Sequence, residues 1–251
     1  MTKSFKKFYV NKKDYIAYKD QIYHKNKKSI IWFGGLYSDM DGTKAKYLSK
    51  FSKKNQINFC RFDYFGHGKS SKEFHNCTIS HWVDNGKKMV DNVFQGPLIL
   101  IGSSMGGWVS LLTALKRKKR VKNLILIAPA TDMTEKLMWK SFSSKERQAV
   151  KRNGFIQRFS EGYDEGYKIT KNLLDDGKKY SILDKEINLN IPIKLFHGMK
   201  DDSVPWRHSL DLINSLSSER IDINFIKDGD HSLSRESDLK HLGDSILEFL
   251  N

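Results

Sequence analysis

One stretch of the sequence, Leu98 to Trp108, constrains the fold more than any other part of the chain. Four consecutive apolar residues, Leu98–Ile101, are typical of a strand that is buried on both faces of a parallel sheet. They lead directly into a glycine–serine motif at residues 102–106, and from Trp108 onward the apolar residues follow helical spacing. The sequence therefore predicts a strand that turns into a helix within about one residue, with Ser104 at the turn.

The glycines of this motif have a physical reason. So abrupt a turn strains the backbone of its central residue and brings the flanking residues close to neighbouring chain, where a Cβ would not fit. Glycine at positions 102 and 106 meets that requirement. The turn also lifts the Ser104 hydroxyl above the sheet edge, beside N–H groups of the helix N-terminus that attract an anion. The pattern indicates a nucleophile elbow; a glycine-rich turn with an idle serine is the alternative that the motif alone leaves open.

A nucleophilic serine needs a base for its proton, and the base needs an anion that holds its tautomer. In folds built on this elbow the acid and then the histidine follow the serine along the chain. Asp201 follows an apolar strand at 191–196, and His231 follows the last predicted strand. Adjacent loop residues point in different directions, so we expect Asp201 to reach His231 near Ser104, and Asp202 to cap the turn or helix that follows.

Acyl transfer also requires donors for the negative oxygen of the tetrahedral intermediate. We expect one donor to be the N–H of Met105, directly after the serine. The second is expected from the loop that follows an early buried strand, at Leu36 after Gly34–Gly35. These two backbone groups form the predicted oxyanion hole.

No metal or cofactor is expected. His197 and Asp201 lie four residues apart, but a loop rather than a helix separates them, and Cys60 and Cys77 have no ligand partners nearby in the sequence. Two cysteines make no disulfide framework, so free thiols in a reducing compartment are predicted.

The formal net charge of +15 suggests an anionic partner. The chain has nine arginines against 35 lysines, which are spread along its whole length. The densest basic cluster, residues 116–120, ends a predicted surface helix, where cations suit the helix dipole. A solvated lysine surface is therefore favoured over a nucleic-acid-binding face, no nucleic-acid partner is expected, and attraction of anionic substrates is compatible with this charge.

No apolar run approaches the roughly 20 residues that a membrane-spanning helix needs. The first ten residues are basic but have no apolar core and no cleavage site of small residues, so secretion is not supported. We expect a cytoplasmic protein; the absence of acidic residues in this segment leaves an organelle transit peptide open. The sequence does not decide between a monomer and a dimer.

Strands and helices alternate through the first half of the chain, which predicts an α/β fold with a mostly parallel central sheet and helices on both faces. Short antiparallel strands or a hairpin are expected at 14–23, at the sheet edge. The other predicted strands are 29–33, 57–62, 98–101, 121–128, 191–196 and 221–226, and the predicted helices are 43–54, 79–94, 206–216 and a last one that ends at Leu250.

The alternation stops after residue 128. Residues 129–190 are charged and helical in places, with large apolar side chains between. We expect one domain over residues 1–251, with a helical cap at 129–190 inserted after the sixth strand; a pair of surface helices is the alternative. Trp139 and Phe142 of the cap, with Trp108 beneath, are predicted to face a substrate, and core packing is the alternative for Trp108.

Several motifs together resemble the α/β-hydrolase family. They span residues 30–231 and comprise Gly34-Gly35, Asp63-x-x-Gly66-x-Gly68-x-Ser70, Gly102-x-Ser104-x-Gly106, His197-Gly198-x-x-Asp201 and Asp230-His231. Within this family the sequence is similar to the mitochondrial palmitoyl-protein thioesterase and acyl-glucuronide esterase group and its bacterial relatives. The resemblance implies a serine hydrolase for acyl esters or thioesters, with Ser104 as nucleophile, Asp201 as acid and His231 as base.

Two other functions stay open at this stage. The first is a serine peptidase of the same fold, which would need a charged handle for the amine of a peptide; the sequence identifies none. The second is a non-catalytic binding protein that uses its basic surface.

Overall fold

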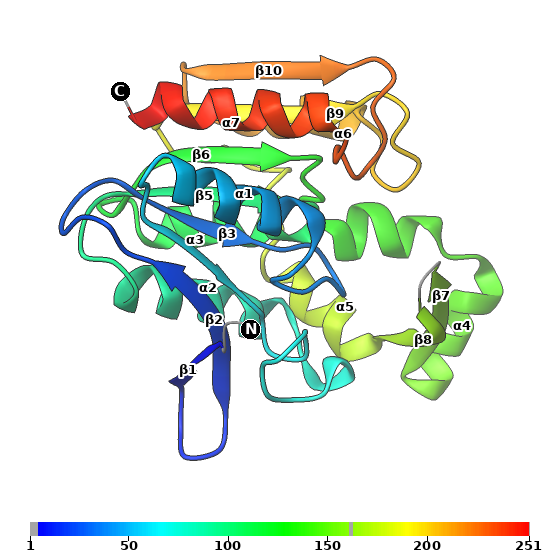
Figure 1. The fold of residues 1–251 in the computed structure, drawn as a ribbon. Coiled ribbons are helices and arrows are strands. Elements are labelled where there is room, and N and C mark those ends of the chain that lie inside the picture. Colours follow the sequence, from blue (N-terminus) through cyan, green and yellow to red (C-terminus); the bar gives the residue numbers. More distant parts are fainter. Residues whose placement is uncertain (1–4, 161–162, 251) are drawn as a thin grey trace.

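The computed structural model of the protein describes residues 5–160 and 163–250. The first four residues of the basic N-terminal segment lie outside this description. An eight-stranded sheet forms the centre of the molecule, in the order β1-β2-β4-β3-β5-β6-β9-β10 (Figure 1). From β4 to β10 all neighbouring strands are parallel, whereas β1 and β2 form an antiparallel hairpin at one edge. The strands are β1 (Lys6–Tyr9), β2 (Tyr15–Gln21), β3 (Ser29–Phe33), β4 (Phe59–Phe62), β5 (Leu98–Ser103), β6 (Val121–Ile127), β9 (Ile193–Gly198) and β10 (Ile221–Ile226).

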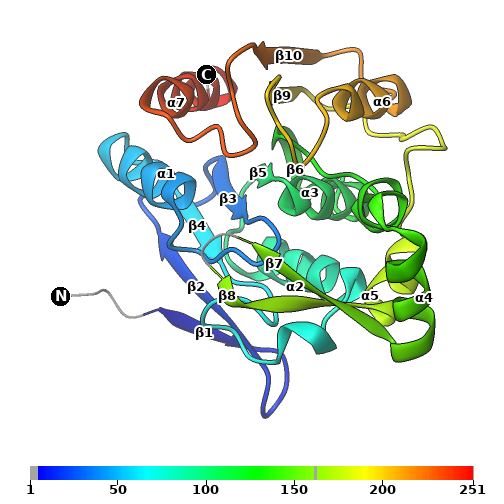
Figure 2. The same cartoon turned by 90° about the vertical axis from the view of Figure 1, so that its right-hand side faces the viewer.

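Helices cover both faces of this sheet, and the predicted α/β fold is confirmed. Helices α1 and α7 lie on one face, and α2, α3 and α6 lie on the other (Figure 2). Their bounds are α1 (Thr43–Lys54), α2 (Ile79–Asn92), α3 (Met105–Lys116), α6 (Arg207–Ser215) and α7 (Glu236–Leu250), and a short 3₁₀ turn, η1, occupies Phe74–Asn76.

Strand β5 shows why its sequence is apolar without alternation. Leu98 and Leu100 pack into the core beneath α2 and α3, while Ile99 and Ile101 pack into the core beneath α1 and α7. Successive side chains of a strand point to opposite faces, so a strand with helices on both sides needs an apolar residue at every position. The central position of β5 places its carboxyl end, and therefore Ser104, in the middle of the sheet edge.

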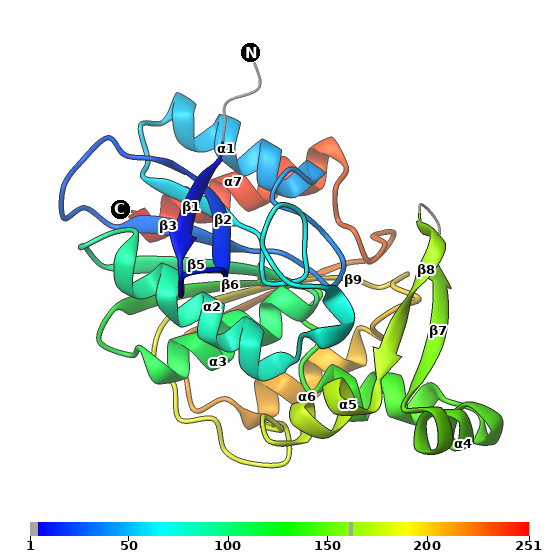
Figure 3. The same cartoon turned by 90° about the horizontal axis from the view of Figure 1, so that it is seen from below.

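The segment between β6 and β9 forms a cap at the carboxyl ends of the parallel strands (Figure 1). Its elements are a π-helical segment η2 (Met133–Trp139), α4 (Ser144–Asn153), β7 (Phe155–Ser160), β8 (Tyr163–Thr170) and α5 (Lys171–Lys178). The antiparallel β7–β8 hairpin was not predicted from the sequence and stands beside the sheet rather than within it (Figure 3).

A small core of its own explains the cap hairpin. Phe142, Val150, Ile156, Ile169 and Leu174 are buried together, so η2's exit, α4, the hairpin and α5 share one apolar cluster. In a two-stranded ribbon only every second residue points into such a cluster, and here charged residues stand between. The alternation that predicts a strand is therefore weak in this part of the sequence.

In the part of the chain that the structure describes, no helix has the length and apolar character that crossing a membrane requires.

The packing of α2 against β3 and α3 can be tested at Gly86. A Cβ at this position would lie 2.7 Å from both Phe33 Cε1 and Thr113 Oγ1. Overpacking a core costs about 1–3 kcal/mol, more than the ~1 kcal/mol that alanine gains over glycine in a helix. Because two atoms lie as close as 2.7 Å, we expect a cost of about 2–3 kcal/mol, so after the helix gain Gly86→Ala should lower the free energy of unfolding by about 1–2 kcal/mol in urea denaturation. Lys88→Ala on the same helix should change it by less than about 0.5 kcal/mol; a Gly86→Ala protein as stable as the wild type would contradict the packing.

Candidate active site

Ser104 occupies a strained turn between β5 and α3. Its backbone has φ 55° and ψ −123°, a conformation that L residues rarely adopt. A Cβ on Gly102 would overlap the carbonyl oxygen of Gly106, and one on Gly106 would overlap the carbonyl oxygens of Phe33 and Gly34. Both glycines are therefore required where the sequence predicted them, because the chain crosses itself and the end of β3 too closely for a side chain.

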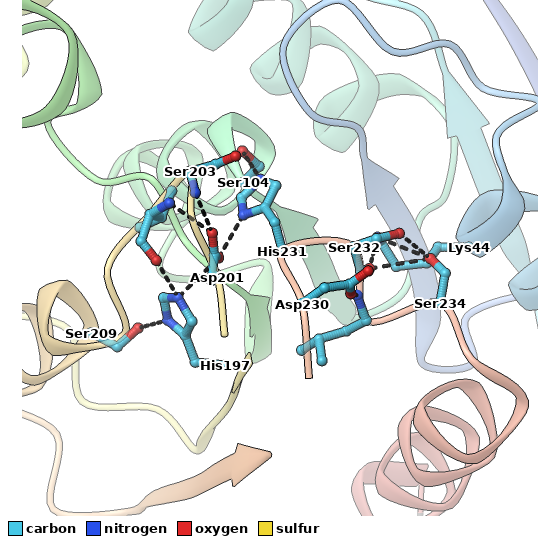
Figure 4. Close-up of polar contacts among 12 residues, drawn as sticks. Lys44, Ser104, His197, Asp201, Ser203, Ser209, Asp230, His231, Ser232 and Ser234 are labelled. Carbon is cyan, nitrogen blue, oxygen red and sulfur yellow. Dashed lines mark hydrogen bonds and ion pairs between the residues drawn. The ribbon is translucent and has the colours of Figure 1, made fainter. Parts of the chain in front are cut away.

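A chain of hydrogen bonds links Ser104, His231 and Asp201 (Figure 4). His231 Nε2 lies 3.0 Å from Ser104 Oγ, and His231 Nδ1 lies 2.6 Å from Asp201 Oδ2. Asp201 comes from the loop after β9 and His231 from the loop after β10, so three distant segments meet at one sheet edge. Because a carboxylate can only accept, Nδ1 carries the proton, and Nε2 of the neutral ring is left to accept from the serine hydroxyl.

Asp201 is a buried carboxylate with a full set of partners. Besides His231 it accepts from the backbone N–H groups of Ser203, at 2.8 Å, and Val204, at 2.7 Å. Burial alone would raise the pKa of Asp201, but hydrogen bonds from His197 and His231 hold it well below its usual range. The expected division between the two aspartates is wrong in one respect: Asp201 itself caps the turn, and exposed Asp202 stands at the edge of a cavity.

His197 is a member of this network that sequence reasoning missed. Its ring is fully buried, with Nε2 at 3.1 Å from Asp201 Oδ2 and 2.9 Å from Val204 O. Both partners are acceptors, so Nε2 carries a proton and donates, while Nδ1 faces the Ser209 hydroxyl at 2.6 Å. The i,i+4 spacing to Asp201 was the available signal. Among the side chains that the structure describes, at residues 5–159 and 166–250, no cluster of three or more His, Cys, Asp or Glu residues could hold a metal ion.

The loop after β3 lies against the serine. A Cβ on Gly35 would lie 3.5 Å from Ser104 Cβ, and Leu36 lines both cavities that reach Ser104. Met105 is the first residue of α3, so its N–H has no acceptor within its own helix. Leu36 and Met105 therefore both lie beside the serine.

Two buried polar residues fix this loop, and the sequence did not assign them a role. The N–H of Tyr37 donates to His67 Nε2 at 3.0 Å, and the N–H of Met40 donates to Asp63 Oδ1 at 2.6 Å. Burial lowers the pKa of His67 to about 4, which keeps its ring neutral and able to accept. Burial also raises the pKa of Asp63 to about 6. The loop after β4 therefore holds the position of Leu36 through the residues that follow it.

Two cavities meet at Ser104, His231 and Leu36. The larger, about 900 Å³, opens beneath the cap, and we call it the cap-side cavity; its apolar lining includes Ala130, Met133, Leu137, Met138 and Val204. The smaller, about 290 Å³, lies toward the start of α1, and we call it the α1-side cavity; its lining includes Trp32, Ser38, Thr43, Lys44 and Ser232.

The three aromatic residues predicted to face a substrate lie elsewhere. Trp108 is fully buried in the core beneath α3, which was the alternative for this residue. Phe142 belongs to the cap's own core, and Trp139 packs against it with ring centroids 6.0 Å apart. None of the three lines either cavity at Ser104. The prediction is corrected because helical spacing shows which residues share a face but not which element covers that face.

A mostly parallel sheet, a serine at a strand–helix elbow and a cap over the strand ends define an α/β-hydrolase. The chain belongs to the family described as serine aminopeptidase, S33, whose model matches residues 24–172, more than half of the sequence. It is therefore a hydrolase of the serine hydrolase type.

Known relatives agree with this assignment. The chain is 33% identical over 213 residues to the mitochondrial palmitoyl-protein thioesterase ABHD10 of Mus musculus. The match covers 84% of this chain and 71% of the relative. The crystal structure of a putative hydrolase from Agrobacterium vitis matches with a TM-score of 0.92 and 31% identity, over 98% of both chains. The structure of mouse ABHD10 matches with a TM-score of 0.89 and 30% identity, again over 98% of both chains.

The neutral ring of His67 generates a testable pH dependence. The unfolded chain binds a proton at this histidine near pH 6.5, whereas the folded protein does so near pH 4. The contribution of His67 to stability is therefore lost as the pH falls from about 6.5 to 4, by about 2–3 kcal/mol at pH 4.5, while Asp63, whose pKa is raised, acts in the opposite direction in wild type and variants alike. His67→Gln, which keeps an acceptor but does not titrate, should lose less stability than the wild type between pH 7 and pH 4.5 in urea denaturation. The exposed-site variant His75→Gln should behave as the wild type, and equal losses in all three proteins would refute the assignment.

Proposed function

We propose that the protein hydrolyses acyl esters or acyl thioesters through a covalent acyl-enzyme, with Ser104, His231 and Asp201 as its catalytic triad. The observation that carries this proposal is the unbroken hydrogen-bonded chain from Asp201 through His231 to the Ser104 hydroxyl. Such a chain supplies both the base that a serine needs and the anion that orients the base.

In the proposed reaction Ser104 Oγ attacks the acyl carbonyl while its proton moves to His231 Nε2. Asp201 stays ionised, since its pKa is held well below the usual range, and stabilises the imidazolium that forms. Collapse of the tetrahedral intermediate breaks the bond to the leaving oxygen or sulfur, which receives the proton from His231. Water then attacks the Ser104 ester by the same route, releasing the carboxylic acid and restoring the hydroxyl.

The N–H groups of Met105 and Leu36 are the proposed oxyanion hole. The first lies at the start of α3 directly after the serine, and the second lies in the loop that His67 and Asp63 hold in place. Each such donor is worth about 3 kcal/mol in the transition state. Because these donors are backbone groups, their positions depend on the loop rather than on side-chain identity.

The cap-side cavity is the proposed site for the acyl chain. Its apolar wall, with Met133, Leu137 and Met138 from the cap, suits a hydrocarbon chain. The mouse relative is a palmitoyl-protein thioesterase, which supports an acyl thioester as substrate. The cytoplasmic location stays a prediction from the sequence. The mouse relative is described as mitochondrial.

The first test is covalent labelling with a fluorophosphonate probe, together with hydrolysis of p-nitrophenyl acyl esters and acyl thioesters of increasing chain length. Wild-type protein should be labelled and should turn over both substrate types. Ser104→Ala should abolish labelling and lower kcat by about 10⁴-fold or more. Ser103→Ala, a matched change one residue earlier, should retain labelling and most of the activity.

Two outcomes would replace this proposal. No labelling of the folded wild-type protein would favour a non-catalytic binding function for the basic surface. The family's description as a serine aminopeptidase makes peptide amides the other arm of the test. Faster cleavage of an aminoacyl p-nitroanilide than of any ester would assign the protein as a peptidase.

A further inference from the structure

A half-buried lysine lies in the wall of the α1-side cavity, close to the serine. Lys44 lines this cavity together with Ser104 and His231. Its ammonium donates to the backbone oxygen of Ser232 and lies 3.5 Å from Ser234 Oγ (Figure 4). Both partners come from the loop directly after His231, so the cation stands on the histidine's side of the serine.

The charge of Lys44 has only neutral partners. Among residues 5–159 and 166–250, whose side chains the structure describes, no carboxylate lies within the 4.0 Å of an ion pair from its ammonium. Burial lowers the pKa of Lys44 to about 8, against the opposing effect of Asp230 and Asp238, and the group is still mainly protonated at neutral pH. Removing a cation from water without an anionic partner is costly, which an anionic ligand would offset.

The N-terminus of α1 adds positive potential to the α1-side cavity beside Lys44. Gly42 is the N-cap of α1 and contributes no side-chain cap, and the first turn of α1 contains no acidic residue. Gly42 and Thr43 line the same cavity, so the positive end of the helix dipole faces it. The carboxylate in the lining, Asp39, is exposed to solvent, and its Oδ1 accepts from the N–H of Asp41.

Cations line both cavities, but their surroundings differ: in the cap-side cavity Lys136 is paired with Asp184, and Lys140 and Arg207 are exposed to solvent, whereas Lys44 is half-buried with neutral partners. We propose that the α1-side cavity binds the leaving group of the substrate, and that Lys44 favours leaving groups that carry a negative charge, a carboxylate or a phosphate. This inference rests on the proposed function, in which the acyl chain lies along the apolar residues of the cap-side cavity. An ester or thioester spans both cavities, because its acyl carbon bonds to Ser104 between them.

A purely structural role for Lys44 predicts something different. If the lysine only ties α1 to the loop after His231, its removal lowers turnover of every substrate by the same factor. If it contacts the leaving group, its removal changes the ratio between charged and neutral substrates. The ratio is therefore the measurement that separates the two roles.

The experiment uses two octanoyl thioesters with matched leaving groups, 3-mercaptopropionate and 3-mercaptopropanol, which differ in a carboxylate against a hydroxymethyl group. At pH 7 the wild type should show a kcat/KM about 10-fold or more higher for the carboxylate thioester, the range expected for one charge-assisted contact. Lys44→Met should bring the ratio close to one, and Lys44→Arg should restore most of it. Lys46→Met, an exposed lysine on the same helix, should keep the wild-type ratio.

The outcomes separate this inference from the function on which it rests. Hydrolysis of both thioesters at equal rates by the wild type, or equal losses on both in Lys44→Met, would overturn the role of Lys44 and leave the hydrolase intact. Turnover of neither thioester by wild-type protein, with no fluorophosphonate labelling, would overturn the proposed function as well. A matched pair of phosphate-bearing and neutral leaving groups extends the ratio to the second anion.

Discussion

The close approach of three backbone segments around Ser104 is the constraint on which the site depends. The carbonyl oxygens of Phe33 and Gly34 lie where a Cβ of Gly106 would be, so β3, β5 and α3 meet with nothing between them. That contact fixes the turn that exposes the serine and also brings the loop carrying Leu36 beside it. A side chain at Gly106 would push the Ser104 turn away from the loop that carries Leu36. The geometry of the nucleophile therefore depends on the position of this loop.

Buried polar groups lie on both sides of this contact, and Asp201, Asp63 and His67 each serve two or more partners. Asp201 accepts from two backbone N–H groups and also faces two imidazoles. On the other side of the serine, Asp63 accepts from Met40 and Lys69, and His67 accepts from Tyr37. Buried polar groups are tolerable only when they are hydrogen-bonded, so satisfying them also makes the loops rigid. Local order at the site and stability of the fold therefore have the same origin.

The sequence by itself determined the parallel part of the sheet, most helices and the residues that meet at the sheet edge. At 14–23 it predicted short antiparallel strands or a hairpin, where the chain forms one strand, β2, that pairs with β1. Helix α1 has the predicted bounds, and β5 and β10 differ from prediction by no more than two residues. Ser104, Asp201 and His231 were chosen from motifs alone and lie in hydrogen-bond contact. Such features are predictable because glycine spacing and apolar runs depend on residues that are neighbours in the sequence. In addition, parallel strands bring their carboxyl ends to one edge of the sheet.

Only the tertiary structure decided what surrounds these residues. Trp108 lies in the main core, Phe142 lies in a separate core of the cap, and the cap forms the β7–β8 hairpin. Asp201, not Asp202, caps the turn after β9. Lys44 of α1 lies beside the loop after His231. Each of these depends on which segments, far apart in the chain, pack against one another. A sequence pattern records the face on which a side chain lies, but the partner that covers that face is set by the packing of the whole chain.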